Sequence, residues 1–294
     1  MSMIASQLVV GLSIAGVLAL VAIGLSFTFG QMNVINFAHG EFVMAGAYVP
    51  YVLQRAGLSA GKSLLVGLPV AIVVAAALGL LLERTLVRRL YGRPLDTLLV
   101  TYGVSLVLQQ AARDLFGAPN VQVLRPSWLD GRLTVGPVQL SYTRLAILVL
   151  ISALVVGVTL LLTRTATGRR MRAVTQNRRL AASSGLPTRR TDAFTFALGS
   201  GLAGAAGVAL ALLGPIGPSL GTFYVVDAFL VVIVGGLGHL RGAVLAALAI
   251  GITNAFVELS LGTSLAKVIV FALVIAFLQL RPQGLVSSRT RALV

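Results

Sequence analysis

The feature that most constrains this chain is a succession of apolar segments, each close to the length that crosses a membrane. A hydrocarbon core of about 30 Å needs roughly 20 apolar residues in a helix. Segments of this kind are 7–30, 38–54, 63–87, 97–115, 143–163, 191–213, 224–237, 243–261 and 265–280. Inside a bilayer each segment must satisfy its own backbone hydrogen bonds, which favours helices. The pattern predicts an all-α polytopic membrane protein with about eight to ten transmembrane segments, forming a single transmembrane domain over 1–294.

Composition agrees with a membrane protein and argues against an enzyme. Of the 294 residues, 57% are hydrophobic and 11% are charged, and the mean hydropathy is +0.96. A soluble domain carries about 25% charged residues. The chain has no cysteine and two histidines, so neither thiol chemistry nor a metal site is expected. It contains no G-x-x-x-x-G-K-[ST] motif, and the G-x-S-x-G match at Gly57–Gly61 falls in a predicted loop.

The net charge of +15 is distributed in a way that argues against nucleic-acid binding. Arginines gather in 84–93, in 164–190 and in the tail after 280, each beside an apolar segment. Positive charge beside spanning segments marks the cytoplasmic side of the membrane. These three regions are therefore predicted to be cytoplasmic, in contact with the lipid bilayer. The number of intervening segments is consistent with this assignment and predicts an external N-terminus.

Two hydrophilic segments are long enough to carry structure of their own. The segment 116–142 is predicted to be an external loop, in which two β-prone runs around Gly136-Pro137 indicate a small hairpin. The segment 164–190 is predicted to be cytoplasmic, with a basic helix over 169–182 that ends before Gly185 and Pro187. A basic amphipathic helix either lies on the membrane surface or inserts into a groove of a partner. The residues alone leave both possibilities open.

Ionisable residues inside apolar segments are the candidates for a transport pathway. Glu41 and Asp227 each fall in a short segment interrupted by glycines, one in each half of the chain. Short or broken segments in corresponding positions point to a binding site near the midplane, so both segments are predicted to be broken or re-entrant. Structural roles remain open for these residues, and Lys267 is equally compatible with the outer surface. The candidate pathway residues are Asn36, His39, Glu41, Asp227 and Asn254.

Three stretches resemble the permease subunits of ATP-binding cassette (ABC) importers for branched-chain amino acids and urea. They are "GLSFTFGQMNVINFAHGEFVMAGAY", "GRRMRAVTQNRRLAASSGL" and "VVIVGGLGHLRGAVLAALAIGITNAFVE". The likeness covers nearly the whole chain. The urea-type permeases look most similar, and Asp227 in "VVDAF" is part of that likeness. Urea is therefore the first expectation for the solute and a branched-chain amino acid the alternative, with a stand-alone secondary transporter or channel as a distant third.

The resemblance also implies partner subunits with separate functions. A second permease subunit, two ABC ATPase subunits and an extracytoplasmic solute-binding protein are expected, in the cytoplasmic membrane of a bacterium. ATP and Mg would be bound by the ATPase subunits, and no cofactor by this chain. The solute would cross by alternating access. The segment 169–185 is expected to couple the permease to the ATPases, through Arg169, Arg170, Arg172, Asn177, Ala181 and Gly185.

Overall fold

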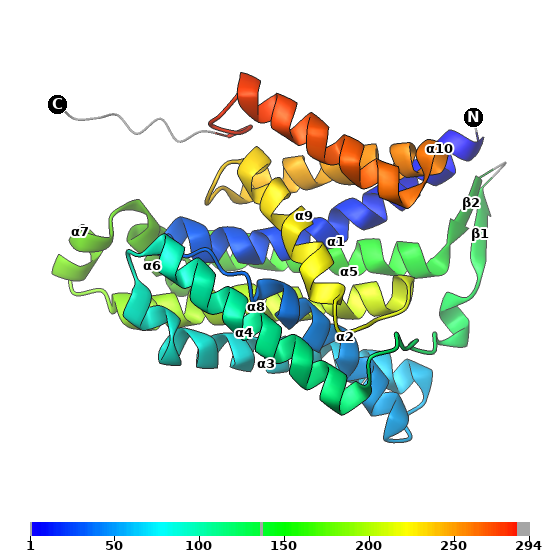
Figure 1. Cartoon of the computed structure of the whole chain (residues 1–294), viewed down its shortest axis with the longest axis horizontal. Helices are drawn as coiled ribbons and strands as arrows, with labels where there is room; N and C mark the ends of the chain where they lie inside the picture. Colours follow the sequence, from blue (N-terminus) through cyan, green and yellow to red (C-terminus); the bar gives the residue numbers. More distant parts are fainter. Residues whose placement is uncertain (1, 136–137, 287–294) are drawn as a thin grey trace.

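The computed structural model describes residues 2–135 and 138–286, and over these it is a helical bundle with one small hairpin (Figure 1). The long helices are α1 (Ser2–Met32), α2 (His39–Arg55), α3 (Ala60–Thr85), α4 (Pro94–Phe116), α5 (Tyr142–Arg164), α8 (Thr188–Leu213), α9 (Leu220–Gly235) and α10 (Leu240–Leu280). Two shorter helices, α6 (Ala166–Gln176) and α7 (Arg178–Ser183), lie between α5 and α8. The hairpin pairs β1 (Arg132–Val135) with β2 (Val138–Ser141) in antiparallel register, within the predicted loop 116–142. Short 3₁₀ turns occupy Val87–Leu90 and Ser127–Leu129.

The predicted class, a polytopic helical membrane protein, is confirmed. Among the described residues, five helices are long and apolar enough to cross a membrane: α1 from Met3, α3, α5, α8 and α10. At 41 residues α10 is longer than one crossing requires, and Gly262 breaks its helical geometry with a φ of 80°. This kink lies between the two segments 243–261 and 265–280, so α10 corresponds to two predicted passes.

Glycine lets three helices approach α8, which is buried along most of its length. A Cβ at Gly46 of α2 would lie 2.2 Å from the Gly204 carbonyl oxygen of α8. A Cβ at Gly204 would lie 2.5 Å from the Ala71 carbonyl oxygen of α3, and one at Gly24 of α1 would lie 2.4 Å from the Gly199 carbonyl oxygen. These distances are too short for a side chain, so the backbones are in direct contact, as in tightly packed membrane bundles.

The predicted breaks lie before the two short helices and not inside them. The segment 33–38 between α1 and α2 is not helical, and neither is the segment 214–219 before α9. Both α2 and α9 are then continuous, at 17 and 16 residues. The expectation that these helices are themselves interrupted was wrong, because their glycines serve as contact points: a Cβ at Gly40 would lie 2.2 Å from the Gly221 carbonyl oxygen.

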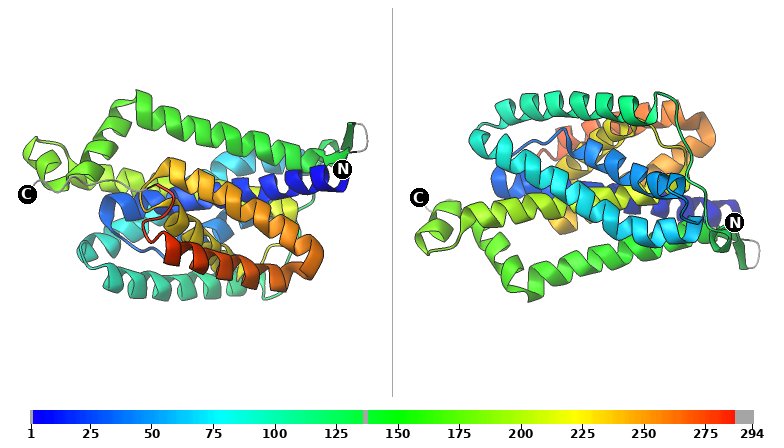
Figure 2. Two further views of the ribbon diagram at one scale, coloured as in Figure 1. Left: turned by 90° about the horizontal axis from the view of Figure 1, so that it is seen from above. Right: turned by 90° about the horizontal axis from the view of Figure 1, so that it is seen from below.

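The basic segments gather at one end of the bundle. In Figures 1 and 2, α6, α7, the turn between α3 and α4, and the end of α10 lie at the end opposite the N-terminus and the β1–β2 hairpin. This separation agrees with the predicted assignment of charge to one side of the membrane.

Candidate functional site

The candidate site begins at the non-helical segment 33–38, which leads from α1 into α2. Asn33 has a φ of 54°, a left-handed conformation that turns the chain at the end of α1. The side chain of Thr101 on α4 then provides hydrogen bonds to this non-helical backbone. Its hydroxyl accepts a hydrogen bond from the Phe37 N–H at 3.0 Å and lies 3.3 Å from the Ile35 carbonyl oxygen. A backbone without helical hydrogen bonds is therefore held inside the bundle by a side chain of a neighbouring helix.

Glu41 links α2 to two other helices through a buried hydrogen-bond cluster. Its Oε1 accepts from the Ser105 hydroxyl and from the Gln109 side-chain amide, both at 2.9 Å. The same amide donates to the Thr222 hydroxyl of α9 at 2.8 Å. Glu41 is 1% exposed. We name Glu41, Ser105, Gln109 and Thr222 the Glu41 cluster.

Two helix starts explain how a carboxylate is tolerated at this depth. Glu41 lies in the first turn of α2. Its Oε2 also lies against the start of α9, because a Cβ at Gly221 would be 2.7 Å from that oxygen. The amino ends of helices carry partial positive charge and stabilise nearby anions. The contact between Gly40 and Gly221 brings the two helix starts together at Glu41.

Several buried polar atoms beside this cluster have no hydrogen-bond partner among the described residues. They are both side-chain polar atoms of Asn36, Nδ1 of His39 and Oε2 of Glu41. The other ring nitrogen of His39, Nε2, lies 3.0 Å from the Val21 carbonyl oxygen of α1. Buried polar groups are nearly always paired with protein or water. The unpaired atoms therefore provide hydrogen-bonding capacity for water or a polar solute.

The remaining two predicted pathway residues lie apart from the Glu41 cluster. Asp227 of α9 pairs with Lys267 of α10, with Oδ2 and Nζ 3.4 Å apart and side chains 28% and 45% exposed. The Lys267 ammonium also lies 5.3 Å from the centre of the Phe223 ring. Asn254 is half-buried on α10, which packs chiefly on α1 and α9. The pairing of Asp227 with Lys267 was not predicted, because the two residues are far apart in the sequence.

The predicted coupling segment is two helices and not one. Asn177 has extended backbone angles (φ −155°, ψ 98°), ending α6 and beginning α7, and its side chain accepts from the Leu180 N–H at 3.0 Å. The prediction of a continuous helix over 169–182 was wrong because an asparagine side chain caps a helix start better than it fills a helix interior. The expected end is found, since Gly185 has a φ of 80° and the Leu186 N–H donates to the Ala181 carbonyl oxygen. Ala181 is buried, whereas Arg169, Arg170 and Arg172 are exposed.

A partly buried ion pair joins this segment to the membrane helices. Arg178, the first residue of α7, forms hydrogen bonds to both carboxylate oxygens of Asp192 in α8. Asp192 is fully buried and also accepts from the Gln31 side chain of α1 at 2.9 Å. The Thr195 hydroxyl of α8 donates a hydrogen bond to the side-chain oxygen of Gln31, Oε1, at 2.9 Å. The loop that carries α7 is thus tied to the end of α1, next to the segment 33–38.

A second buried carboxylate lies beside this pair. Glu83 of α3 is fully buried and accepts two hydrogen bonds from Arg88, at 3.1 and 3.0 Å, and one from the Tyr91 hydroxyl at 2.7 Å. The Arg88 pKa is raised by this pairing. The Tyr91 pKa is also raised, by burial first and by the bond to Glu83 second, so the phenol stays protonated and donates. The Arg178 guanidinium lies 5.2 Å from the centre of the Tyr91 ring, which connects the two carboxylates.

The partners of Glu41 were not predicted, although α4 carries a recognisable signal. Thr97, Thr101, Ser105 and Gln109 recur every four residues and are all buried, while the apolar side chains Leu99, Leu106 and Val107 point outward. A polar stripe at helical spacing on a membrane helix predicts a face turned toward the bundle. Glu83 and Asp192 gave no such signal, because a carboxylate near a helix end is also compatible with interfacial water.

Comparison with known proteins agrees with the resemblance in the sequence. Residues 7–278 match the family described as "Branched-chain amino acid transport system / permease component". The high-affinity branched-chain amino acid transport system permease protein BraD of Pseudomonas aeruginosa is 32% identical over 291 residues, covering 95% of this chain and 94% of the relative. LivH of Escherichia coli K12, a permease protein of the same description, is 31% identical over 291 residues with the same coverage. The probable branched-chain amino acid transport permease protein LivH of Methanocaldococcus jannaschii is 30% identical over 289 residues, covering 92% of this chain and 89% of the relative.

No solved structure is significantly similar to the chain. The family match spans nearly all the described helices, from α1 to the last turn of α10. The relatives are covered almost end to end and carry the same description. The chain therefore belongs to the family of permease components of branched-chain amino acid transport systems.

Proposed function

We propose that the chain is the membrane-spanning permease subunit of an ABC importer that carries branched-chain amino acids. The observation that carries this proposal is the set of near full-length relatives described as branched-chain amino acid permeases. Urea was the first expectation from the sequence, and none of these relatives supports it. We therefore place branched-chain amino acids first. Urea is the second candidate, favoured by the similarity around Asp227.

The chemistry of the α9–α10 face supports an amino acid over urea. A branched-chain amino acid is a zwitterion with an apolar side chain, so it needs both charges and an apolar surface. Asp227 and Lys267 offer opposite charges that are partly exposed. Phe223 and Val226 are exposed on the same helix as Asp227, at 59% and 41%. Urea is neutral and would gain little from an ion pair. The Glu41 cluster, with Asn36, His39 and the more distant Asn254, would supply hydrogen bonds along the path.

The proposed assembly adds partners around this chain. A second permease subunit would cover part of the exposed membrane face, because a charged pair is costly against lipid. Two ATPase subunits, which bind ATP and Mg, would dock on α6 and α7, where Arg169, Arg170 and Arg172 are exposed. An extracytoplasmic binding protein would deliver the solute at the opposite end. Hydrolysis would occur on the partners, so this chain is a transport subunit and not an enzyme.

The linked polar groups suggest how movement at the ATPases would reach the pathway. Arg178 and Asp192 tie α7 to α8 and, through Gln31, to the end of α1. Gln31 lies two residues before Asn33, where the chain leaves α1 for the non-helical segment. A shift of α7 would thus displace the segment that carries Asn36 and leads to Glu41. Alternating access requires such a two-state element, biased by the partners.

The test is uptake of labelled solute into proteoliposomes that hold the intact importer, with and without ATP on the nucleotide side. We expect ATP-dependent leucine uptake that excess valine inhibits and excess urea leaves unchanged. ATP-dependent uptake of urea that leucine does not inhibit would overturn the substrate and keep the family. Uptake by this chain alone, without ATP, would favour a stand-alone transporter and overturn the ABC importer reading.

A further inference from the structure

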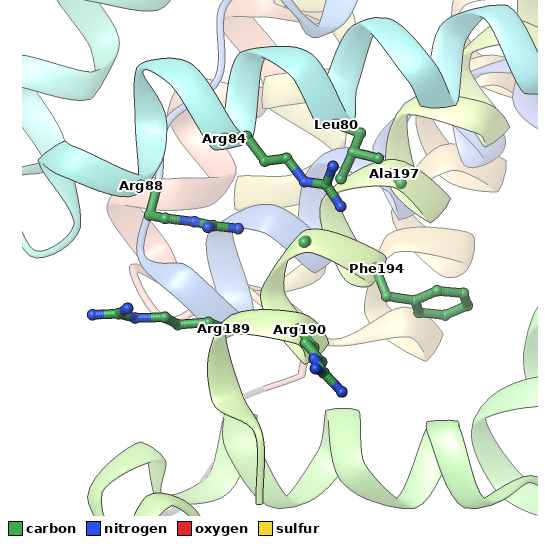
Figure 3. Close-up of a pocket in the computed structure, with 8 residues that line it drawn as sticks. Leu80, Arg84, Arg88, Arg189, Arg190, Phe194 and Ala197 are labelled. Carbon is green, nitrogen blue, oxygen red and sulfur yellow. The ribbon is translucent and has the colours of Figure 1, made fainter.

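A cleft between α3 and α8 gathers four arginines at the end of the bundle that carries α6 and α7. It has a volume of about 460 Å³ and is lined by Leu80, Arg84, Arg88, Arg189, Arg190 and Phe194, among others. We name it the arginine cleft. Figure 3 shows Arg84 and Arg88 on the end of α3 and the turn after it. Arg189 and Arg190 lie across from them at the start of α8, with their side chains directed outward.

The arginine cleft carries positive charge that the described residues do not neutralise. The two nearby carboxylates are already engaged, Glu83 by Arg88 and Asp192 by Arg178. Arg84, Arg189 and Arg190 form no ion pair within residues 2–135 and 138–286. The first turn of α8 contains Arg189 and Arg190 and no acidic residue. A helix start is itself positive, so the cleft favours an anion.

The floor of the arginine cleft is apolar and continues into the membrane. Phe194, one turn beyond Arg190, is 41% exposed although α8 is otherwise mostly buried. Leu80 lies one turn before Arg84 on α3, and Val73, seven residues earlier on the same face, is 66% exposed. An occupant that satisfies both parts of the cleft has an anionic head and an apolar tail. A basic pocket between membrane helices on the cytoplasmic side is suited to such lipids.

We propose that the arginine cleft binds the phosphate headgroup of an anionic phospholipid from the cytoplasmic leaflet, with an acyl chain along α3 and Phe194. Arginine suits this role because its planar guanidinium forms paired hydrogen bonds with phosphate oxygens. Arg84 on α3 and Arg190 on α8 both line the cleft, so the two helices would each contribute one arginine to the headgroup. The bound lipid would hold the end of α3 to the start of α8, next to the ion pair that anchors α7.

The test uses the intact importer, stripped of lipid in detergent, with phosphatidylglycerol added and bound lipid counted by native mass spectrometry. The R84Q/R190Q variant is expected to bind phosphatidylglycerol about 25-fold more weakly, since each arginine near an anionic headgroup contributes roughly a factor of five. The matched control is R89Q/R164Q, which removes two exposed arginines at the same end but outside the cleft. R84K/R190K keeps the charge and should keep most of the binding.

Other outcomes would overturn the proposal. Equal losses of phosphatidylglycerol binding in R84Q/R190Q and R89Q/R164Q would show a general charge effect. Equal binding of phosphatidylcholine would show that the cleft does not distinguish an anionic from a zwitterionic headgroup. Displacement of phosphatidylglycerol by millimolar inorganic phosphate would identify a free phosphate site instead. Loss of the ATPase subunits from R84Q/R190Q, with lipid binding unchanged, would make the cleft a protein docking surface.

Discussion

Glu41 is the residue at which three membrane helices meet, and its substitution tests the candidate pathway. Glu41→Gln keeps the size of the side chain and one acceptor oxygen for Ser105 and Gln109, but removes the charge between the starts of α2 and α9. If that charge positions solute or water, ATP-dependent leucine uptake should fall by about tenfold, a change of roughly 1.4 kcal/mol in the barrier. The assembly should still form and purify intact.

The control for this substitution is Asp114→Asn on α4. Asp114 is exposed and accepts a hydrogen bond from Gln110 at 2.8 Å, one turn earlier in the same helix. Removing its charge should leave uptake unchanged. Normal uptake by the Glu41→Gln importer would instead assign Glu41 a purely structural role in joining α2, α4 and α9.

Gly40 tests the direct contact between α2 and α9. Alanine at this position would place its Cβ 2.2 Å from the Gly221 carbonyl oxygen, so backbone must move. Such overpacking destabilises by about 1–3 kcal/mol. Equilibrium unfolding of the purified protein in SDS should show a lower midpoint for Gly40→Ala.

Alanine at a matched glycine on α4 should not lower the unfolding midpoint. A Cβ at Gly103 would meet nothing within 4 Å, and alanine favours a helix by up to about 1 kcal/mol relative to glycine. Gly103→Ala should therefore leave the unfolding midpoint unchanged or raise it slightly. Equal midpoints for Gly40→Ala and Gly103→Ala would contradict the close crossing at Gly40.

At the scale of elements, the apolar pattern predicted most helices because a membrane helix is defined by length and hydrophobicity. The segment 63–87 corresponds to Ala60–Thr85 and the segment 97–115 to Pro94–Phe116, within a few residues. The position of the breaks was harder to predict. A glycine such as Gly40 reads equally as a helix breaker and as a contact point, and only the neighbouring backbone decides between them. For the same reason Asn177 was read as part of a helix and is the cap between two.

The Arg178–Asp192 pair tests whether α7 is anchored to the bundle. Breaking a buried ion pair costs about 3 kcal/mol or more, and the 38% exposure of the Arg178 side chain places the expected loss at the low end. A double-mutant cycle of Arg178→Gln and Asp192→Asn, measured by SDS unfolding, should give a coupling energy of about 1–3 kcal/mol. The single variants should also hydrolyse ATP with less leucine transported per ATP.

The exposed pair Arg93–Asp96 provides the comparison. Its closest atoms are 3.8 Å apart and its side chains are 73% and 50% exposed. Surface pairs of this kind contribute about 0–1 kcal/mol, so the corresponding cycle should give a coupling energy near zero. A cycle at Arg178 and Asp192 that is equally small would mean that α7 is not held by this pair.

At the scale of the whole molecule, the separation of the basic segments from the β1–β2 hairpin predicts an orientation in the membrane. The chain contains no cysteine, so single cysteines can be labelled without background. Thr134 lies in the hairpin and Ser184 follows α7 at the opposite end, and both are exposed. A membrane-impermeant maleimide should label Thr134→Cys in intact spheroplasts and label Ser184→Cys only after permeabilisation.

Ser200 supplies the buried control for this experiment. It is fully buried on α8, with its hydroxyl bonded to the Phe196 carbonyl oxygen at 2.8 Å. Ser200→Cys should react in neither condition until the protein is unfolded. The side of the membrane on which α6 and α7 lie decides whether they can contact the ATPase subunits. The labelling result therefore tests the proposed docking as well as the orientation. Labelling of Ser184→Cys from outside would place the arginine-rich loop away from the cytoplasm, and the proposed coupling through Arg178 could then not operate.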